Sequence, residues 1–387
     1  MQEKGIILTQ YGYLLILTIF LVIDVDFSFG FYLRILIALM FLSVLFQKQG
    51  IKRFYRPIEI VFIIFTIVYS IRFIFDIFLK DVEVLGYTRS YLINYFFLLI
   101  ILPITSIINN RKRPNIKKFI SYLWIFTILA NIFSVAYFLV NGLDIEFLYS
   151  SRAEVRSDDG NSTILNPITI GHLGVSLLLQ VIWRFKNTNS LLILLLVPFG
   201  IINLLISASR GPIMILLIIL FLIIIRKVIS KNRNWIMILI GILFTYLFYN
   251  YFFINIYQND VYLINRLLST TESYGEESRF IIWNSALNDF LNNPIFGNSI
   301  VTNGGSYPHN VFLEILMSTG VIGFILFIII FSYLIFKTSK KIIFSNFNNE
   351  DYINIWWLAI FLSSLTSGAL FFNPILWIST IYILKNE

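Results

Sequence analysis

Long apolar runs recur along the whole sequence, and short polar segments separate them. A run of about 20 apolar residues can cross about 30 Å of hydrocarbon as a helix. We place twelve such spans, at residues 5–23, 29–46, 58–79, 91–108, 119–140, 166–183, 191–206, 212–225, 235–254, 311–336, 352–368 and 374–384. Barrel strands would instead be short and alternating. The pattern predicts an all-α integral membrane protein that forms one polytopic domain over residues 1–387.

One long polar interval, residues 255–310, interrupts this pattern between the ninth and tenth spans. Within it, apolar residues recur every three or four positions, at Phe280, Trp283, Leu287 and Phe290. That spacing predicts an amphipathic helix lying on the membrane surface.

Composition and charge agree with a membrane protein. The hydrophobic fraction is 58%, the charged fraction is 13% and the mean hydropathy is +0.82. Lys and Arg concentrate in alternate connecting segments, which places both termini in the cytoplasm by the positive-inside rule. This topology accounts for the net charge of +8 without a nucleic-acid partner. There is no cysteine, which excludes disulfides and thiolate ligands.

The same topology puts two arginine-bearing loops on the outer, periplasmic side. These are the loop at residues 141–165 and the large loop at residues 255–310. Arg210 lies outside as well, at the tight turn between the seventh and eighth spans, where Gly211-Pro212 allows a hairpin. We therefore look for the chemistry on this side.

Charged residues inside the spans give an independent indication. The charges at Arg34, Arg72, Asp76 and Glu314 all fall in the outer half of the membrane. A charge in hydrocarbon costs about 2.5–3.5 kcal/mol even on lenient scales, so such residues face a polar cavity or each other. Arg72 and Asp76, four residues apart, can form a simple pair. The set otherwise suggests a cationic cavity that suits a lipid-linked pyrophosphate, because arginine forks onto phosphate oxygens.

Several short motifs then occur in order on the outer side. They are Ser207-Ala-Ser-Arg-Gly211, Arg279 followed by Trp283, Asn293-Pro-Ile-Phe-Gly297, Pro308-His-Asn310, and Gly320 followed by Gly323. Together they resemble the superfamily of O-antigen polymerases and O-antigen ligases. The resemblance covers spans seven to ten and the large loop.

This resemblance implies a glycosyltransferase of the GT-C type, inverting and independent of metals and other cofactors. Such enzymes move a glycan from undecaprenyl pyrophosphate to a sugar hydroxyl at the outer face of the bacterial inner membrane. Carried over, Arg210 and Arg279 would bind the pyrophosphate and stabilise its leaving charge. His309 would accept the proton of the attacking hydroxyl or position that hydroxyl.

The remaining predicted site residues follow from the residues themselves. Arg152 and Arg156 would bind the second glycan or its phosphate, and Glu314 would orient the His309 imidazole. Tyr307 and Trp283 are candidate sugar-stacking platforms. Asn310 and Arg72 complete the predicted substrate-binding set.

Simpler structural roles remain open for most of these residues. Arg210 can anchor its helix at the headgroups, and Asn310 can cap the helix that follows His309. Arg279 can neutralise the neighbouring Glu276 and Glu277. Arg152 and Arg156 can belong to a solvated loop, and His172 can make a polar contact between helices.

Three functions compete. We favour a polymerase that joins lipid-linked repeat units, because polymerases carry two arginine-bearing outer loops. A ligase that transfers finished polymer to lipid A core is the alternative. A glycan-lipid flippase is disfavoured, since transporters show repeated halves and interrupted helices, which the sequence lacks. The expected partners are the bilayer and a lipid-linked oligosaccharide, with a chain-length regulator protein as a further candidate.

Overall fold

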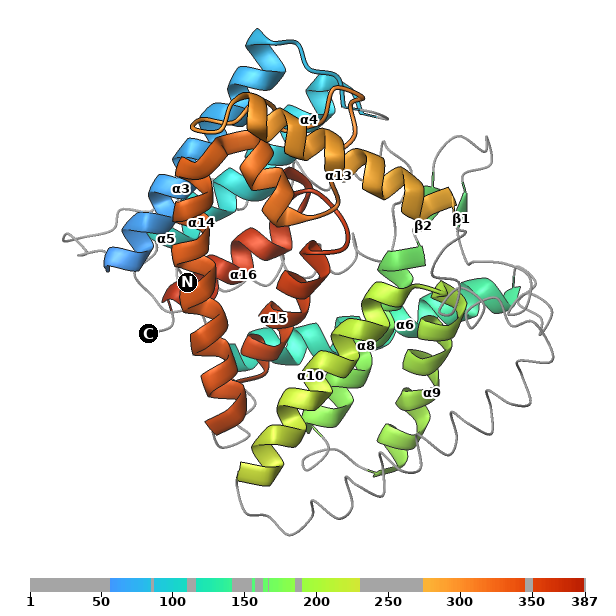
Figure 1. The fold of residues 1–387 in the computed structure, drawn as a ribbon. Helices are drawn as coiled ribbons and strands as arrows, with labels where there is room; N and C mark the ends of the chain where they lie inside the picture. The colour runs from blue at the N-terminus through green and yellow to red at the C-terminus, as the bar shows by residue number, and fades with distance from the viewer. Residues whose placement is uncertain are drawn as a thin grey trace, which may run out of the picture.

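The computed structural model describes residues 56–84, 87–109, 116–140, 155–156, 163–165, 167–184, 190–229, 274–344 and 351–385. These residues are almost entirely helical (Figure 1). The first half contains α3 (Pro57–Ile74) with its π-helical extension η1 (Phe75–Leu79), α4 (Arg89–Phe96), the π-helical η2 (Phe97–Ile101), α5 (Leu102–Asn109), α6 (Ile116–Val140), α8 (Pro167–Arg184) and α9 (Ser190–Ser207). The second half contains α10 (Arg210–Ile229), α13 (Tyr274–Asn292), α14 (Val311–Phe344), α15 (Tyr352–Ser364), the short 3₁₀ helix η5 (Leu370–Phe372) and α16 (Pro374–Lys385).

The helices confirm the predicted class. Each predicted span that falls on described residues coincides with a helix, whereas those at 5–23, 29–46 and 235–254 lie outside the described residues. Within the described part, three helices are long and apolar enough to cross a membrane: Pro57–Leu79, Leu123–Val140 and Val311–Phe344. The total of twelve crossings and the GT-C architecture stay predictions.

A small strand pair lies in the predicted 141–165 loop. Strand β1 (Val155–Arg156) pairs antiparallel with β2 (Thr163–Leu165), and Val155 lies opposite Leu165. The backbone of Arg156 is thereby placed in a hairpin.

Helices α8 and α9 pack closely because glycines face each other. A Cβ atom on Gly174 would lie 2.5 Å from the carbonyl oxygen of Gly200, so neither position tolerates a side chain without movement. Small residues of this kind let the backbones of membrane helices approach. Buried polar side chains add to the contact: Asn203 Nδ2 donates to Asn131 Oδ1 at 2.8 Å, which joins α9 to α6.

The turn between α9 and α10 differs from the predicted hairpin. Gly211-Pro212 does not form the turn; both residues lie in the first turn of α10, where proline is tolerated. The turn is made by Ala208 and Ser209, and Ala208 adopts a left-handed φ of 43°. Arg210 is therefore the first residue of α10.

Helix α14 is interrupted at Gly320, which has φ 63° and ψ −162°. The segment that follows α13 seals this break. The N–H of Val321 donates to the Pro294 carbonyl at 2.8 Å, and the N–H of Asn298 donates to the Met317 carbonyl at 2.7 Å. Backbone groups released by the break thus find partners, as buried backbone must. The expectation that no helix is interrupted was wrong.

Basic side chains gather where several helices end, away from this break. Arg226 Nη1 donates to the Ile342 carbonyl at 3.1 Å, and Lys337 Nζ donates to the Ile383 carbonyl at 3.2 Å. Lys385 Nζ likewise bonds the Ile107 carbonyl. Cations are favoured at helix C-termini, where the carbonyls and the negative end of the dipole lie. The end of the bundle that carries Lys337 and Lys385 is the one that the positive-inside rule assigns to the cytoplasm.

Candidate active site

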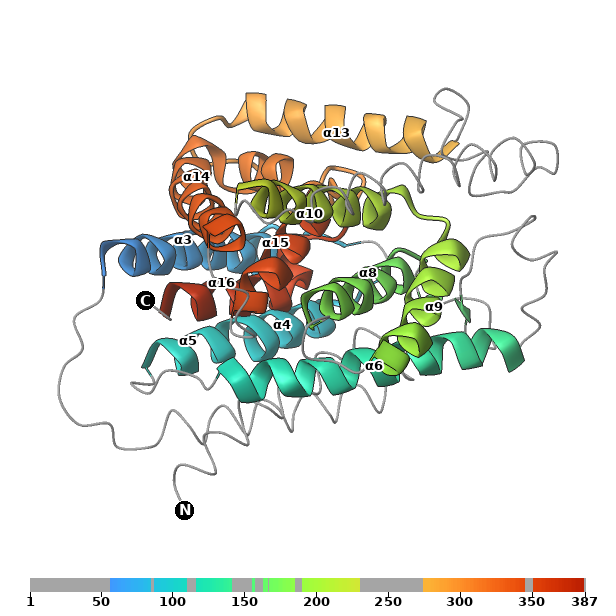
Figure 2. The same ribbon diagram turned by 90° about the horizontal axis from the view of Figure 1, so that it is seen from below.

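The site is built on α13, the loop at residues 298–310 and the start of α14. Helix α13 packs against α14 on the outside of the bundle (Figure 2). It lies where the sequence predicted an amphipathic helix, and Phe280 and Leu287 are exposed as expected. Trp283 Nε1 donates to the Pro308 carbonyl at 2.8 Å. The indole thus holds the residue before His309 while Trp283 stays 37% exposed, and its role as a sugar-stacking platform stays a prediction.

His309 is held in an unusual environment. Its φ of 55° is left-handed, which is costly for a residue with a Cβ and indicates a constrained position. The Tyr307 ring lies 4.4 Å from the imidazole, centroid to centroid. The Nδ1 atom is buried and has no hydrogen-bond partner among the described residues.

Burial and the nearby Arg279 charge keep the His309 imidazole neutral. Burial, followed by the Arg279 charge, lowers the pKa of His309 from 6.5 to about 4. At neutral pH the imidazole is therefore uncharged and able to take a proton. The structure brings Arg279 and His309 together, as the motif order suggested. The alternative partners Glu276 and Glu277 have side chains outside the described residues.

Asn310 caps the N-terminus of α14, which is the alternative structural role that the sequence allowed for it. Its Oδ1 accepts from the backbone N–H of Phe312 at 3.0 Å and of Leu313 at 3.3 Å. It thereby satisfies two of the donors that a helix start leaves free. A contact between Asn310 and substrate stays a prediction.

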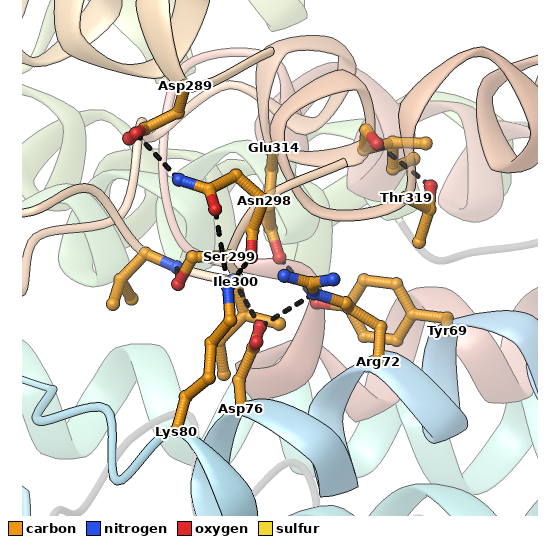
Figure 3. Close-up of polar contacts among 12 residues, drawn as sticks. Tyr69, Arg72, Asp76, Lys80, Asp289, Asn298, Ser299, Ile300, Glu314 and Thr319 are labelled. Carbon is orange, nitrogen blue, oxygen red and sulfur yellow. Dashed lines mark hydrogen bonds and ion pairs between the residues drawn. The ribbon is translucent and has the colours of Figure 1, made fainter. Parts of the chain in front are cut away.

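Glu314 does not bond to His309, contrary to the role predicted for it. Its fully buried carboxylate accepts from Tyr69 Oη at 2.6 Å and from the backbone N–H of Leu370 at 2.7 Å. Figure 3 shows Tyr69 and Glu314 close together behind the loop that carries Ser299 and Ile300. Glu314 therefore joins α14 to α3 and to the segment before α16.

Tyr307 contacts the His309 imidazole and lies close enough to Glu314 to be influenced by its charge. Burial, with the Glu314 charge, raises the pKa of the Tyr307 hydroxyl. The ring packs edge-on against Phe371 at 6.1 Å and Phe372 at 6.4 Å. Glu314 thus acts on the aromatic residue beside His309 and not on the imidazole directly.

Arg72 forms an ion pair with Asp76, which is the simpler of the two roles that the sequence allowed for it. Arg72 Nε lies 2.9 Å from Asp76 Oδ2, and the same oxygen accepts from the Ile300 N–H at 2.8 Å (Figure 3). The carboxylate therefore ties η1 to the 298–310 loop. A direct role of Arg72 in binding substrate stays a prediction.

A second set of hydrogen bonds beside this ion pair was not predicted from the sequence. Lys80 Nζ donates to the Asn298 carbonyl at 2.7 Å, while Asn298 Nδ2 donates to Asp289 Oδ1 at 3.0 Å (Figure 3). Helix α13, the loop and the end of η1 are thus locked together. The sequence signal was available, because Asp289 is a carboxylate on an otherwise uncharged stretch of the predicted helix.

Arg210 lies at the start of α10, and its place in the site stays a prediction. A Cβ on the adjacent Gly211 would meet Thr366 Oγ1 at 3.0 Å, so the start of α10 lies against the segment that follows α15. That segment continues to Leu370, which Glu314 binds. Figure 1 shows α10 and α14 beginning toward the same side of the bundle.

The sequence singled out three further residues. Arg152 lies outside the described residues, as does the side chain of Arg156. His172 lines a separate cavity of about 290 Å³ between α6, α8 and α15, and no described residue bonds its buried Nε2. For that nitrogen, the predicted polar contact between helices is absent from the described part of the chain.

The fold is largely helical with helices of membrane-spanning length, and in the site the Arg279 charge lies close enough to His309 to lower its pKa. Residues 191–328 match the family model described as O-antigen ligase, so this segment of the chain is similar to that family. This segment contains Arg210, Arg279 and His309, and it confirms the resemblance to the polymerase and ligase superfamily. The search of curated proteins and the search of solved structures each gave no match.

Proposed function

We propose that this protein is a membrane glycosyltransferase that polymerises lipid-linked repeat units at the outer face of the bacterial inner membrane. The observation that carries the proposal is a half-buried, neutral His309 with the Arg279 charge close by. A general base must be unprotonated at working pH, and a leaving phosphate needs a fixed cation. His309 meets the first requirement and Arg279 meets the second.

In the proposed reaction, a sugar hydroxyl of one lipid-linked unit attacks the anomeric carbon of another. The new glycosidic bond forms as the bond to undecaprenyl pyrophosphate breaks, with inversion. The hydroxyl proton passes to His309, and Arg279 and Arg210 neutralise the departing pyrophosphate. As the first residue of α10, Arg210 adds its charge to the positive end of a helix dipole.

The neighbouring residues support these two steps. Trp283 fixes Pro308, and Asn310 starts α14, so His309 is held from both sides. Arg152 and Arg156 remain our candidates for the second glycan. Neither metal nor cofactor takes part in this scheme.

The family model is described as O-antigen ligase, and this favours transfer to lipid A core as the second candidate. Both reactions use the same donor and the same site, and they differ only in the acceptor. The interrupted α14 removes one of the two arguments against a transporter. The closeness of the Arg279 charge to His309 supports chemistry over transport.

One assay separates these functions. Purified protein receives a single synthetic lipid-pyrophosphate repeat unit with EDTA and without lipid A core. We expect a ladder of longer lipid-linked glycans from wild type and from the control Lys341→Ala, whose exposed side chain lies near the far end of α14. His309→Ala should give none.

Transfer that appears only after lipid A core is added would identify a ligase. If EDTA abolishes the ladder, the metal-independent scheme is wrong. If neither acceptor is used, glycan transfer itself is excluded and transport becomes the leading function.

A further inference from the structure

A polar groove of about 1060 Å³ lies beside the candidate active site. One wall is the segment from Lys80 to Leu92, and the other is the loop from Asn298 to Gly305. The loop is folded back on itself, since the Thr302 N–H donates to the Ser306 carbonyl at 2.9 Å. The next residue is Tyr307, whose ring contacts the His309 imidazole.

The groove carries no excess charge. Its ionisable lining residues are Lys80, Asp81, Glu83 and Arg89, two of each sign. Asp81 and Arg89 form an ion pair, and Lys80 is bonded to Asn298. A phosphate gains little from such a lining, whereas an uncharged ligand rich in hydroxyl groups finds donors and acceptors on both walls.

A row of aromatic rings runs from the groove to the histidine. Tyr87 is 41% exposed in the groove and lies 4.6 Å from Phe372, centroid to centroid. Phe372 in turn contacts Tyr307 at 6.4 Å, and Tyr307 contacts His309 at 4.4 Å. An exposed aromatic ring offers a flat apolar face with a polar tip, which suits the C–H face of a sugar ring.

An amide-lined hollow of about 410 Å³ extends this surface along α13. Asn284, Asn288 and Asn292 line it at successive helical turns beside one carboxylate, Asp289, which accepts from Asn298, and Asn303 lines both the hollow and the groove. Each amide offers both a donor and an acceptor, as a hydroxyl group does. The combined surface exceeds the roughly 300–1,000 Å³ of a typical small-molecule pocket, so it has room for several sugar rings.

We propose that this groove and the amide-lined hollow bind an uncharged stretch of several sugars, adjacent to the sugar whose hydroxyl reacts at His309. The inference rests on the proposed function, because it names the glycan-binding part of the same site. The two regions divide the substrate between them. The cationic region takes the pyrophosphate, and the neutral groove takes the glycan.

The test uses full-length protein in nanodiscs and lipid-free oligosaccharides of one and two repeat units, released from the surface polysaccharide of the source strain and labelled at one end. Fluorescence anisotropy gives the Kd. We expect the two-unit probe to bind more tightly than the one-unit probe. Tyr87→Ala should weaken its binding about three- to tenfold, as loss of an aromatic contact predicts. Tyr87→Phe should restore it.

Asn288→Ala, on the exposed face of α13, gives an independent second variant and should also weaken binding of the two-unit probe. Raising NaCl should leave binding unchanged, because the groove is neutral. No binding by wild type, an unchanged Kd in both variants, or loss of binding in salt would each overturn the proposal.

His309→Ala separates this proposal from the proposed function, because it should abolish transfer and retain oligosaccharide binding. Binding that depends on Tyr87, without transfer to either acceptor, would refute the proposed function alone. Transfer that depends on His309, with binding indifferent to Tyr87 and Asn288, would refute the groove alone.

Discussion

The protonation state of His309 offers the sharpest test of the site. An ordinary histidine with a pKa near 6.5 is about 90% protonated at pH 5.5. With its pKa lowered to about 4, His309 would be only about 3% protonated at that pH. Activity limited by this base should therefore persist to pH 5.5 and fall only as the pH approaches 4.

The chain makes the measurement direct, because it contains only two histidines. In a His172→Gln variant labelled with ¹³C-histidine, the single remaining imidazole signal reports the pKa of His309. Arg279→Gln is the matched perturbation. Removing its charge should raise the pKa, but not to 6.5, because burial is the larger cause.

The same shift has a consequence for stability. Because folding lowers the pKa, the unfolded chain binds the proton more readily between about pH 6.5 and pH 4. The contribution of His309 to stability is thus fully present above pH 6.5 and is lost as the pH falls toward 4. A wild-type imidazole that titrates near 6.5, or one indifferent to Arg279→Gln, would refute the reasoning.

Three structural predictions can be checked by thermal unfolding in detergent. Gly320→Ala places a Cβ in a left-handed, crowded position and should lower the free energy of unfolding by about 1–3 kcal/mol through backbone strain alone. Gly304→Ala, whose Cβ would point into open space, is the control and should leave stability nearly unchanged. Trp283→Phe keeps a ring but leaves the Pro308 carbonyl without its indole donor, so we expect the free energy of unfolding to fall by about 1 kcal/mol and transfer to slow. Unchanged transfer would show that this hydrogen bond does not position the site. Asn310→Ala should cost about 1 kcal/mol as a lost cap, whereas Asn310→Asp should retain stability; equal stability of both variants would contradict the capping role.

Hydrophobic periodicity was sufficient to predict the helices. Apolar runs of membrane length leave few alternatives, because backbone in hydrocarbon must bond to itself. The helix α13 and the meeting of Arg279 with His309 also followed from spacing and motif order. These features depend on local sequence, or on short motifs that can be read directly in the sequence.

The partners of the embedded charges could not be predicted in the same way. Glu314 is near His309 in sequence, yet Tyr69 and Leu370 hold its carboxylate. Those residues come from distant parts of the chain, and only the packing of α3, α14 and η5 brings them together. The turn at Ala208 was missed for a related reason, since Gly211, three residues later, packs closely against Thr366 and does not form the turn.

Gly297 and Gly320 lie in close backbone contact, and this contact limits which residues homologous sequences can carry at the two positions. A Cβ on Gly297 would lie 2.4 Å from the Ser318 carbonyl carbon, and one on Gly320 would lie 2.7 Å from the Gly297 nitrogen. Both methyl groups would open the same contact, so the crowding cost of the second substitution should be smaller than that of the first. We expect homologous chains to keep both glycines or to replace both together, and a double-mutant cycle should give less than the sum of the two single changes.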